Sequence, residues 1–114
     1  MALVTGAGSG IGAAAARRLA EDGWGVILVG RRRSALETTE RSLVGDGHVV
    51  MDVDVSDRRA FHAALRRTLG EPNGGAQLTG VFANAGIGGA NVYAEDADHD
   101  RWDDIMRINV TGVY

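Results

Sequence analysis

The stretch Thr5-Gly6-Ala7-Gly8-Ser9-Gly10-Ile11-Gly12 separates a short apolar run, Ala2-Leu3-Val4, from the helix-forming residues 13–20. This order predicts a strand, a glycine-rich turn and the start of a helix. The first N–H groups of a helix have no partner within it, and the peptide dipoles add a partial positive charge there. Because glycines let an anion approach the backbone closely, the stretch predicts a phosphate-binding turn.

Largely apolar runs predict three further strands, at residues 26–29, 48–51 and 78–83. Strands that alternate with helix patterns of this length indicate a parallel sheet with right-handed crossovers. We expect an α/β fold, a Rossmann-type doubly wound parallel sheet with strand order 3-2-1-4 in these residues, truncated before its second half. The chain, 1–114, is then the N-terminal part of a single dinucleotide-binding domain.

The helices between these strands are predicted from their capping patterns. Ser34-Ala35-Leu36-Glu37 matches a capping box, which predicts a helix from there to about Val44. Ser56 is the predicted N-cap of the next helix, whose apolar stripe repeats every fourth residue (Phe61, Leu65, Leu69). A last helix is predicted from about Arg101.

Composition excludes several classes of function. A net charge of −3 argues against a general role in binding nucleic acid or a membrane surface, and the lack of cysteine excludes disulfides. No apolar run approaches the roughly 18–20 residues of a membrane span, and no signal segment precedes the first strand, so we expect a cytoplasmic protein. The irregular stretch 86–100 is interpreted as a solvated loop; a metal site built from its carboxylates and His99 is the alternative.

Arg31-Arg32-Arg33 directly follow the predicted second strand. In a dinucleotide-binding unit, an acidic residue near this point accepts a hydrogen bond from the 2′-hydroxyl of NAD, whereas arginine accommodates the 2′-phosphate of NADP. No carboxylate stands here, and a guanidinium can bind a phosphate through two hydrogen bonds. We therefore expect NADP, with NAD possible, held by Arg31 and Arg32. The alternative is that these arginines only keep the turn soluble and support the next helix.

Three later segments join the glycine turn in a characteristic order: Asp54-Val55-Ser56-Asp57, Ala83-Asn84-Ala85-Gly86 and Arg107-Ile108-Asn109-Val110-Thr111-Gly112. Together with Thr5-Gly6-x-x-x-Gly10-x-Gly12, they resemble the short-chain dehydrogenase/reductase family. The turn at 83–86 departs from the family's Asn-Asn-Ala-Gly pattern at Ala83. The resemblance implies an NAD(P)-dependent oxidoreductase that interconverts a carbonyl and an alcohol on a small organic substrate, as a homodimer or homotetramer.

The same resemblance implies roles for individual residues. Asp54 and Val55 would contact the adenine. The alternative is that Asp54 only caps the next helix or its own turn. The pyrophosphate would lie on the glycine turn and the ribose along the turn after the fourth strand, where Asn84 as a simple turn residue is the alternative. The residues implied for these two groups are Gly6, Ser9, Gly10, Ile11 and Gly12 for the pyrophosphate, and Asn84, Ala85 and Gly86 for the ribose.

Asn109 would match the asparagine of the family's catalytic tetrad. It falls on one helical face with apolar residues at the helical spacing (Trp102, Ile105, Met106, Val110, Val113). An unsatisfied amide on such a face would cost about 1–3 kcal/mol. Asn109 therefore either organises a water and proton path, as the resemblance implies, or bonds to nearby backbone in a structural role.

All 12 basic residues are arginine. In the family, the acid–base group is a tyrosine, helped by a lysine four residues later and by an upstream serine. Tyr114 is the last residue here and cannot begin such a motif, so we expect these residues to be the N-terminal part of a longer enzyme and to be inactive alone. Two alternatives stay open: a non-catalytic NAD(P)-binding sensor or interaction module, and an inactive product without a stable fold.

Overall fold

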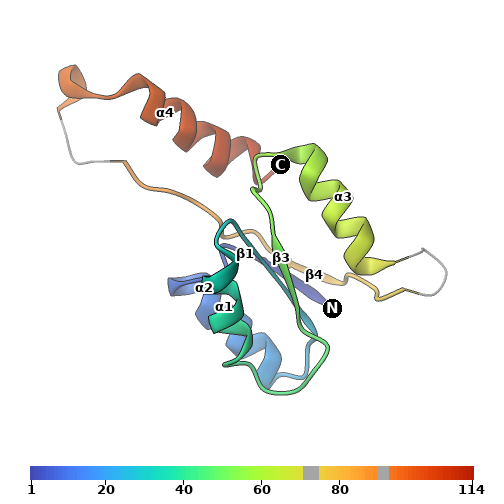
Figure 1. Cartoon of the computed structure of the whole chain (residues 1–114). Helices are drawn as coiled ribbons and strands as arrows, with labels where there is room; N and C mark the ends of the chain where they lie inside the picture. The colour runs from blue at the N-terminus through green and yellow to red at the C-terminus, as the bar shows by residue number, and fades with distance from the viewer. Residues whose placement is uncertain (71–74, 90–92) are drawn as a thin grey trace.

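The computed structural model describes residues 1–70, 75–89 and 93–114. In them, four parallel strands form one sheet in the order β3-β2-β1-β4 (Figure 1). The strands are β1 (Ala2–Thr5), β2 (Val26–Gly30), β3 (Val49–Asp52) and β4 (Gly80–Phe82). The predicted fold class and strand order are therefore confirmed.

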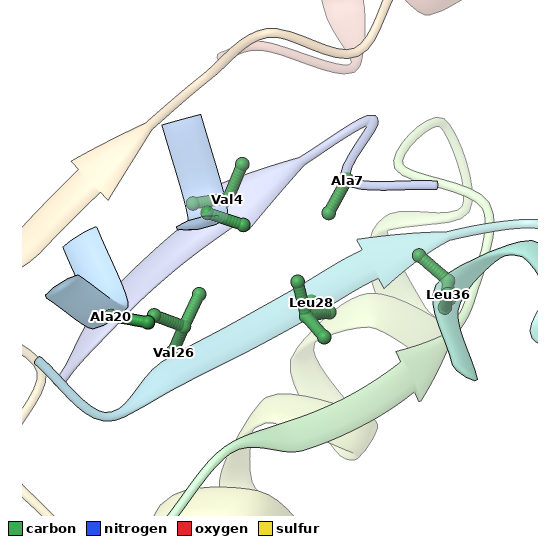
Figure 2. Close-up of a cluster of buried hydrophobic side chains, with 7 residues drawn as sticks. Val4, Ala7, Ala20, Val26, Leu28 and Leu36 are labelled. Atoms are coloured by element: carbon green, nitrogen blue, oxygen red, sulfur yellow. The ribbon is translucent and has the colours of Figure 1, made fainter. Parts of the chain in front are cut away.

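The two central strands, β1 and β2, are buried on both faces, as their continuous apolar sequences require. Alternate side chains point to opposite faces of a strand. Val4, Val26 and Leu28 pack on the face covered by α1 (Gly10–Glu21) and α2 (Arg33–Glu40) (Figure 2). Their neighbours on the other face, such as Ile27 and Val29, pack against α3 (Arg58–Leu69). The sheet thus lies between two helical layers.

Helix α2 is shorter than its sequence predicts. It begins at Arg33 and ends at Glu40 instead of continuing to about Val44. The hydroxyl of Ser42 donates to the carbonyl of Thr39 at 2.6 Å, and this competing bond turns the chain out of the helix. The predicted capping box is wrong, because Arg32 occupies the N-cap position and no side chain caps the helix.

Helix α3 begins one residue later than predicted, because Asp57, not Ser56, is its cap. The Asp57 carboxylate accepts a hydrogen bond from the N–H of Ala60 at 3.0 Å. Ser56 instead directs both its N–H and its hydroxyl to Asp54. The predicted stripe of Phe61, Leu65 and Leu69 does pack against the sheet.

Strand β4 is also shorter than the predicted 78–83, since it pairs with β1 only from Ala2↔Gly80 to Val4↔Phe82. It forms one edge of the sheet, and Val81 on it is 64% exposed. The pairing ends where the side chain of Thr5 takes over the hydrogen bonds of the following residues.

The last helical segment consists of α4 (His99–Met106) and a π-helix, η2 (Arg107–Thr111), after a short 3₁₀ turn, η1 (Ala94–Asp96). Asp98 caps α4, which begins at His99, two residues before the predicted start. The wider π turn changes the helical register, so Ile108 is the buried residue of η2 and Asn109 is exposed. The single apolar face predicted through Asn109 is therefore wrong. Figure 1 shows α4 projecting away from the sheet.

Across the described ranges, no helix combines the length and the apolar character that crossing a membrane requires.

Candidate functional site

A cleft of about 170 Å³ opens at the carboxyl ends of the strands. Parallel strands place the loops that follow them at one edge of the sheet, where doubly wound folds bind their ligands. The end of each strand, or the loop after it, contributes to the lining. Gly6, Gly8 and Ser9 follow β1, Gly30 ends β2 and is followed by Arg31 and Arg32, Val53 to Val55 follow β3, and Ala85 to Ile87 follow β4. The structure thus brings together most of the residues that the sequence singles out.

The glycine turn leads from β1 into α1 at the side of this cleft. Gly6 and Gly10 have φ of 68° and 53°, a left-handed conformation that favours glycine. Ser9 lines the cleft and stands at the N-cap of α1, so the N-terminus of that helix faces the cleft. The next residues, Gly10 and Ile11, open the helix but do not line the cleft.

Gly12 packs against the turn that leaves β1. It is buried, and a Cβ there would come within 2.2 Å of the Gly6 carbonyl oxygen and 2.8 Å of the Asn84 side chain. Its small size therefore lets α1 approach the turn closely. A large side chain at Gly12 would displace the turn itself.

The turn after β4 is fastened to the end of β1 by Thr5. The Thr5 hydroxyl oxygen accepts hydrogen bonds from the N–H groups of Asn84 and Ala85, both at 2.9 Å. The Asn84 amide donates to the Thr5 carbonyl at 3.2 Å. These bonds form although Ala83 departs from the family pattern, and through them the backbone and the amide of Asn84 hold the turn to the end of β1.

The three arginines after β2 differ in their partners. Arg33 forms ion pairs with Glu37 at 2.9 Å and with Asp52 at 2.8 Å. The hydrogen bond to Glu37 is the main cause that raises the pKa of Arg33 above its ordinary value. Arg31 and Arg32 are exposed and line the cleft, and no ion pair within the described ranges involves either of them.

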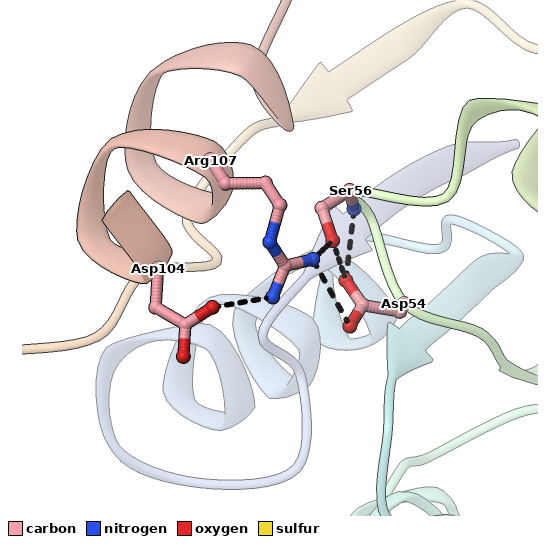
Figure 3. A network of polar contacts seen from close by, with 4 residues as sticks. All are labelled: Asp54, Ser56, Asp104 and Arg107. Atoms are coloured by element: carbon pink, nitrogen blue, oxygen red, sulfur yellow. Dashed lines mark hydrogen bonds and ion pairs between the residues drawn. The ribbon is translucent and has the colours of Figure 1, made fainter. Parts of the chain in front are cut away.

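Asp54 belongs to a polar network that links the loop after β3 to the last helical segment (Figure 3). Its Oδ1 accepts from the N–H of Ser56 at 2.8 Å and from the Ser56 hydroxyl at 2.6 Å. Partial burial would raise the pKa of Asp54, but the bonds from Ser56 and the charges of Arg107 and Arg31 outweigh it and lower the pKa. Asp54 is thus a charged group that both caps its own turn and lines the cleft.

Asn109 bonds to the backbone beside the cleft. Its side chain accepts from the N–H of Ile87 at 2.8 Å and donates to the Ile87 carbonyl at 2.9 Å. Gly86 lies beneath it, since a Cβ there would meet the Asn109 Oδ1 at 3.3 Å. The amide predicted to need partners therefore has them, and it holds the segment that follows the turn after β4.

Sequence reasoning missed several residues of the site. One of them is Thr5, for which a usable signal exists, because it is a polar residue that ends an apolar strand. Leu36, Ile87 and Ile108 line the cleft as apolar walls. Ile108 could not be found from periodicity, because the π turn moves it inward.

The acidic stretch 86–100 includes residues 90–92, which lie outside the described residues. In the part of the chain that the structure describes, no group of three or more His, Asp or Glu side chains could hold a metal ion.

Comparison with known proteins places the chain in a family. A family profile described as short chain dehydrogenase matches residues 1–114. The sulfoacetaldehyde reductase of Chromohalobacter salexigens is 36% identical over 111 residues, which make up 96% of this chain and 43% of that protein. The chain belongs to the short-chain dehydrogenase/reductase family of oxidoreductases.

Solved structures agree with the fold. A metagenomic short-chain oxidoreductase in complex with NADP has a TM-score of 0.83 and 28% identity, covering 97% of this chain and 50% of that one. An NAD⁺-bound xylitol dehydrogenase has a TM-score of 0.81 and 34% identity, covering 98% of this chain and 43% of that one. The chain thus spans half the length, or less, of these relatives.

Proposed function

We propose that the protein carrying this chain is an NAD(P)-dependent oxidoreductase that prefers NADP and interconverts a carbonyl and an alcohol on a small organic substrate. The family is one of dehydrogenases and reductases, and the two structural relatives above hold NADP and NAD⁺. The chain's part in this function is to hold the cofactor.

The proposed preference for NADP rests on a difference in ion pairing among the three arginines after β2. Arg33 is already paired with two carboxylates, whereas Arg31 and Arg32 face the cleft without such a pair among the described residues. Two cationic side chains at the end of the second strand suit a 2′-phosphate, and the carboxylate that would select the 2′-hydroxyl of NAD is not there.

The cleft is too small for the whole cofactor, and its lining residues suggest which end it would bind. Its volume, about 170 Å³, is below the roughly 300–1,000 Å³ of a whole ligand site. We assign it to the adenosine and phosphate end: Arg31 and Arg32 for the 2′-phosphate, Asp54 and Val55 for the adenine. The N-terminal turn of α1, with Gly6, Ser9, Gly10 and Ile11, would bind the pyrophosphate, while Gly12 shapes that turn.

The remaining assignments concern the reacting end. The cofactor, when bound, supplies hydride transfer. Asn84, Ala85 and Gly86 would lie along the ribose, and Asn109 would hold the adjacent Ile87 backbone in place and take part in a proton relay. A homodimer or homotetramer and a cytoplasmic location belong to the same proposal.

Titration of the native protein with NADPH and NADH at low salt tests the cofactor preference. A charge-assisted bond to the 2′-phosphate is worth about 1.5–3 kcal/mol, so NADPH should bind at least roughly tenfold more tightly. Equal affinities would overturn the preference for NADP, and failure of both to bind would overturn the site.

The intact mass of the native protein and a turnover assay distinguish an enzyme from a binding module. These residues account for 12.0 kDa. A mass near twice that, with reduction of carbonyl compounds by NADPH, supports the enzyme. A mass of 12.0 kDa with nucleotide binding but no turnover supports a non-catalytic sensor or interaction module.

A further inference from the structure

One arginine joins two walls of the cleft that lie far apart in the sequence. Arg107 begins η2, and its guanidinium donates to the hydroxyl of Ser56, in the loop after β3, and to Asp104 Oδ1 at 2.8 Å (Figure 3). Val55, next to Ser56, and Ile108, next to Arg107 itself, both line the cleft. Arg107 therefore sets the distance between the loop after β3 and η2.

The chemistry of arginine fixes the direction of this network. A guanidinium has only donors, so the Ser56 oxygen must accept from Arg107. The single hydroxyl proton of Ser56 then goes to Asp54 Oδ1, at 2.6 Å, beside the N–H of Ser56 at 2.8 Å. Both of these donors use the same oxygen of Asp54.

The other oxygen, Asp54 Oδ2, stays available as an acceptor. Its nearest described cation is Arg107 Nη1 at 4.0 Å, which is beyond hydrogen-bond distance. No hydrogen bond among the described residues uses Oδ2. A carboxylate oxygen held in this way in the wall of a cleft accepts from a ligand N–H and repels a ligand carbonyl oxygen.

We propose that Arg107 is a positioning residue, which orients Asp54 through Ser56 so that the cleft selects a ligand with an exocyclic amino group. This inference rests on the proposed function, which puts the adenine of the cofactor at Asp54. Adenine carries an amino donor where hypoxanthine carries a carbonyl acceptor, so the two bases test the orientation of Asp54 directly.

Loss of Arg107 removes the constraint without removing Asp54. The Ser56 hydroxyl can then rotate away from Oδ1, and the loop after β3 loses its tie to η2. The residues assigned to the phosphates and to the ribose lie on other elements, so their contacts should change little. The expected result is a weaker preference for adenine over hypoxanthine.

The experiment measures dissociation constants of NADPH and of its hypoxanthine analogue for the native protein and for Arg107→Met. In Arg107→Met, the constant for NADPH should rise about three- to tenfold, while that for the analogue changes less than about twofold. Ser56→Ala should give the same pattern, and combining both changes should add little to either one. Arg18→Met is the matched control, because Arg18 is an exposed arginine paired with Glu21 and Asp22 on α1.

Each outcome decides between the inference and the proposed function. A larger effect on NADPH than on the analogue, absent in Arg18→Met, supports the positioning role. An equal loss for both nucleotides means that Arg107 is merely structural, and no loss for either means that it does not act on Asp54; both overturn the inference. If the unmodified protein binds neither nucleotide, the proposed function fails and the inference falls with it.

Discussion

Gly12 lies against the carbonyl group of Gly6, so closely that a Cβ on Gly12 would stand 2.2 Å from the Gly6 oxygen. The contact joins the first turn of α1 to the turn that leaves β1. Any side chain at position 12 must push the helix away from the turn, and this gives the first prediction.

Gly12→Ala should destabilise the protein by at least about 1–3 kcal/mol, the usual cost of overpacking, and Gly12→Trp should also abolish NADPH binding by displacing the turn. Urea unfolding measures the first effect and titration the second. Gly88→Ala is the control, because a Cβ at Gly88 meets nothing within 4 Å. Similar stabilities for Gly12→Ala and Gly88→Ala would contradict the packing role of Gly12.

Thr5→Val should weaken the turn after β4, because it removes the oxygen that accepts from the N–H groups of Asn84 and Ala85. An unsatisfied donor costs at most about 1–3 kcal/mol when it is buried, and these two N–H groups are part-buried. The urea midpoint should therefore fall, and the two amides should exchange hydrogen faster. Thr5→Ser keeps the hydroxyl, so its urea midpoint should fall much less. If Thr5→Ser lowers the midpoint as much as Thr5→Val, the hydroxyl does not hold the turn to β1.

Changing Arg31 and Arg32 together to Met should raise the dissociation constant of NADPH roughly tenfold to a hundredfold, because one or more charge-assisted bonds to the 2′-phosphate are lost. The constant for NADH should stay within about twofold. Arg33→Met is the matched control, since Arg33 is occupied by Glu37 and Asp52. An equal loss of affinity for NADPH and NADH would show that these arginines do not contact the 2′-phosphate.

The pH dependence of stability should reveal the ionised state of Asp54. Its pKa in the folded protein lies below the ordinary 3.8, so ionised Asp54 adds stability that is present above about pH 3.8 and is lost as the pH falls through the lowered pKa. The difference in unfolding free energy between the native protein and Asp54→Asn should be constant above about pH 5 and shrink below pH 3.8. If the difference in unfolding free energy between the two proteins grew as the pH fell, the pKa of Asp54 would be raised by folding, and the lowered pKa would be refuted.

Asn109→Ala should loosen the segment that follows β4, since both hydrogen bonds to the Ile87 backbone are lost. Each is worth about 0.5–1.5 kcal/mol, and the Ile87 amide should exchange hydrogen correspondingly faster. Val110→Ala changes the exposed neighbour and serves as the control. Unchanged exchange at Ile87 would mean that the amide does not hold this segment.

Much of the fold could be predicted because its signals are local and agree with one another. The apolar run at Val26 and the glycine turn between Thr5 and Gly12 each specify one element, and alternation of strands with helices specifies the parallel order. The place of Arg31 after the second strand and the resemblance of the segment at Asp54 to the family each indicate a cofactor contact, and both residues line the cleft.

The helix boundaries were predicted wrongly where a side chain has two possible hydrogen-bond partners. Ser42 bonds to the Thr39 carbonyl and ends α2 early, and Ser56 bonds to Asp54 while Asp57 caps α3. Local sequence offers both partners in each case, and only the folded backbone decides between them. The π turn at Arg107–Thr111 is a further case, since it changes the helical register that periodicity assumes and puts Ile108, not Asn109, in the interior.

The pairing of Ala2 with Gly80 bears on how this protein is made. β1 is an inner strand of the sheet, yet one of its neighbours lies 78 residues further along the chain (80 − 2). At about 5–20 residues per second, synthesis of that interval takes on the order of 4–16 seconds. During that time β1 can pair only with β2, so its other edge stays without a hydrogen-bonding partner until Gly80 has been added.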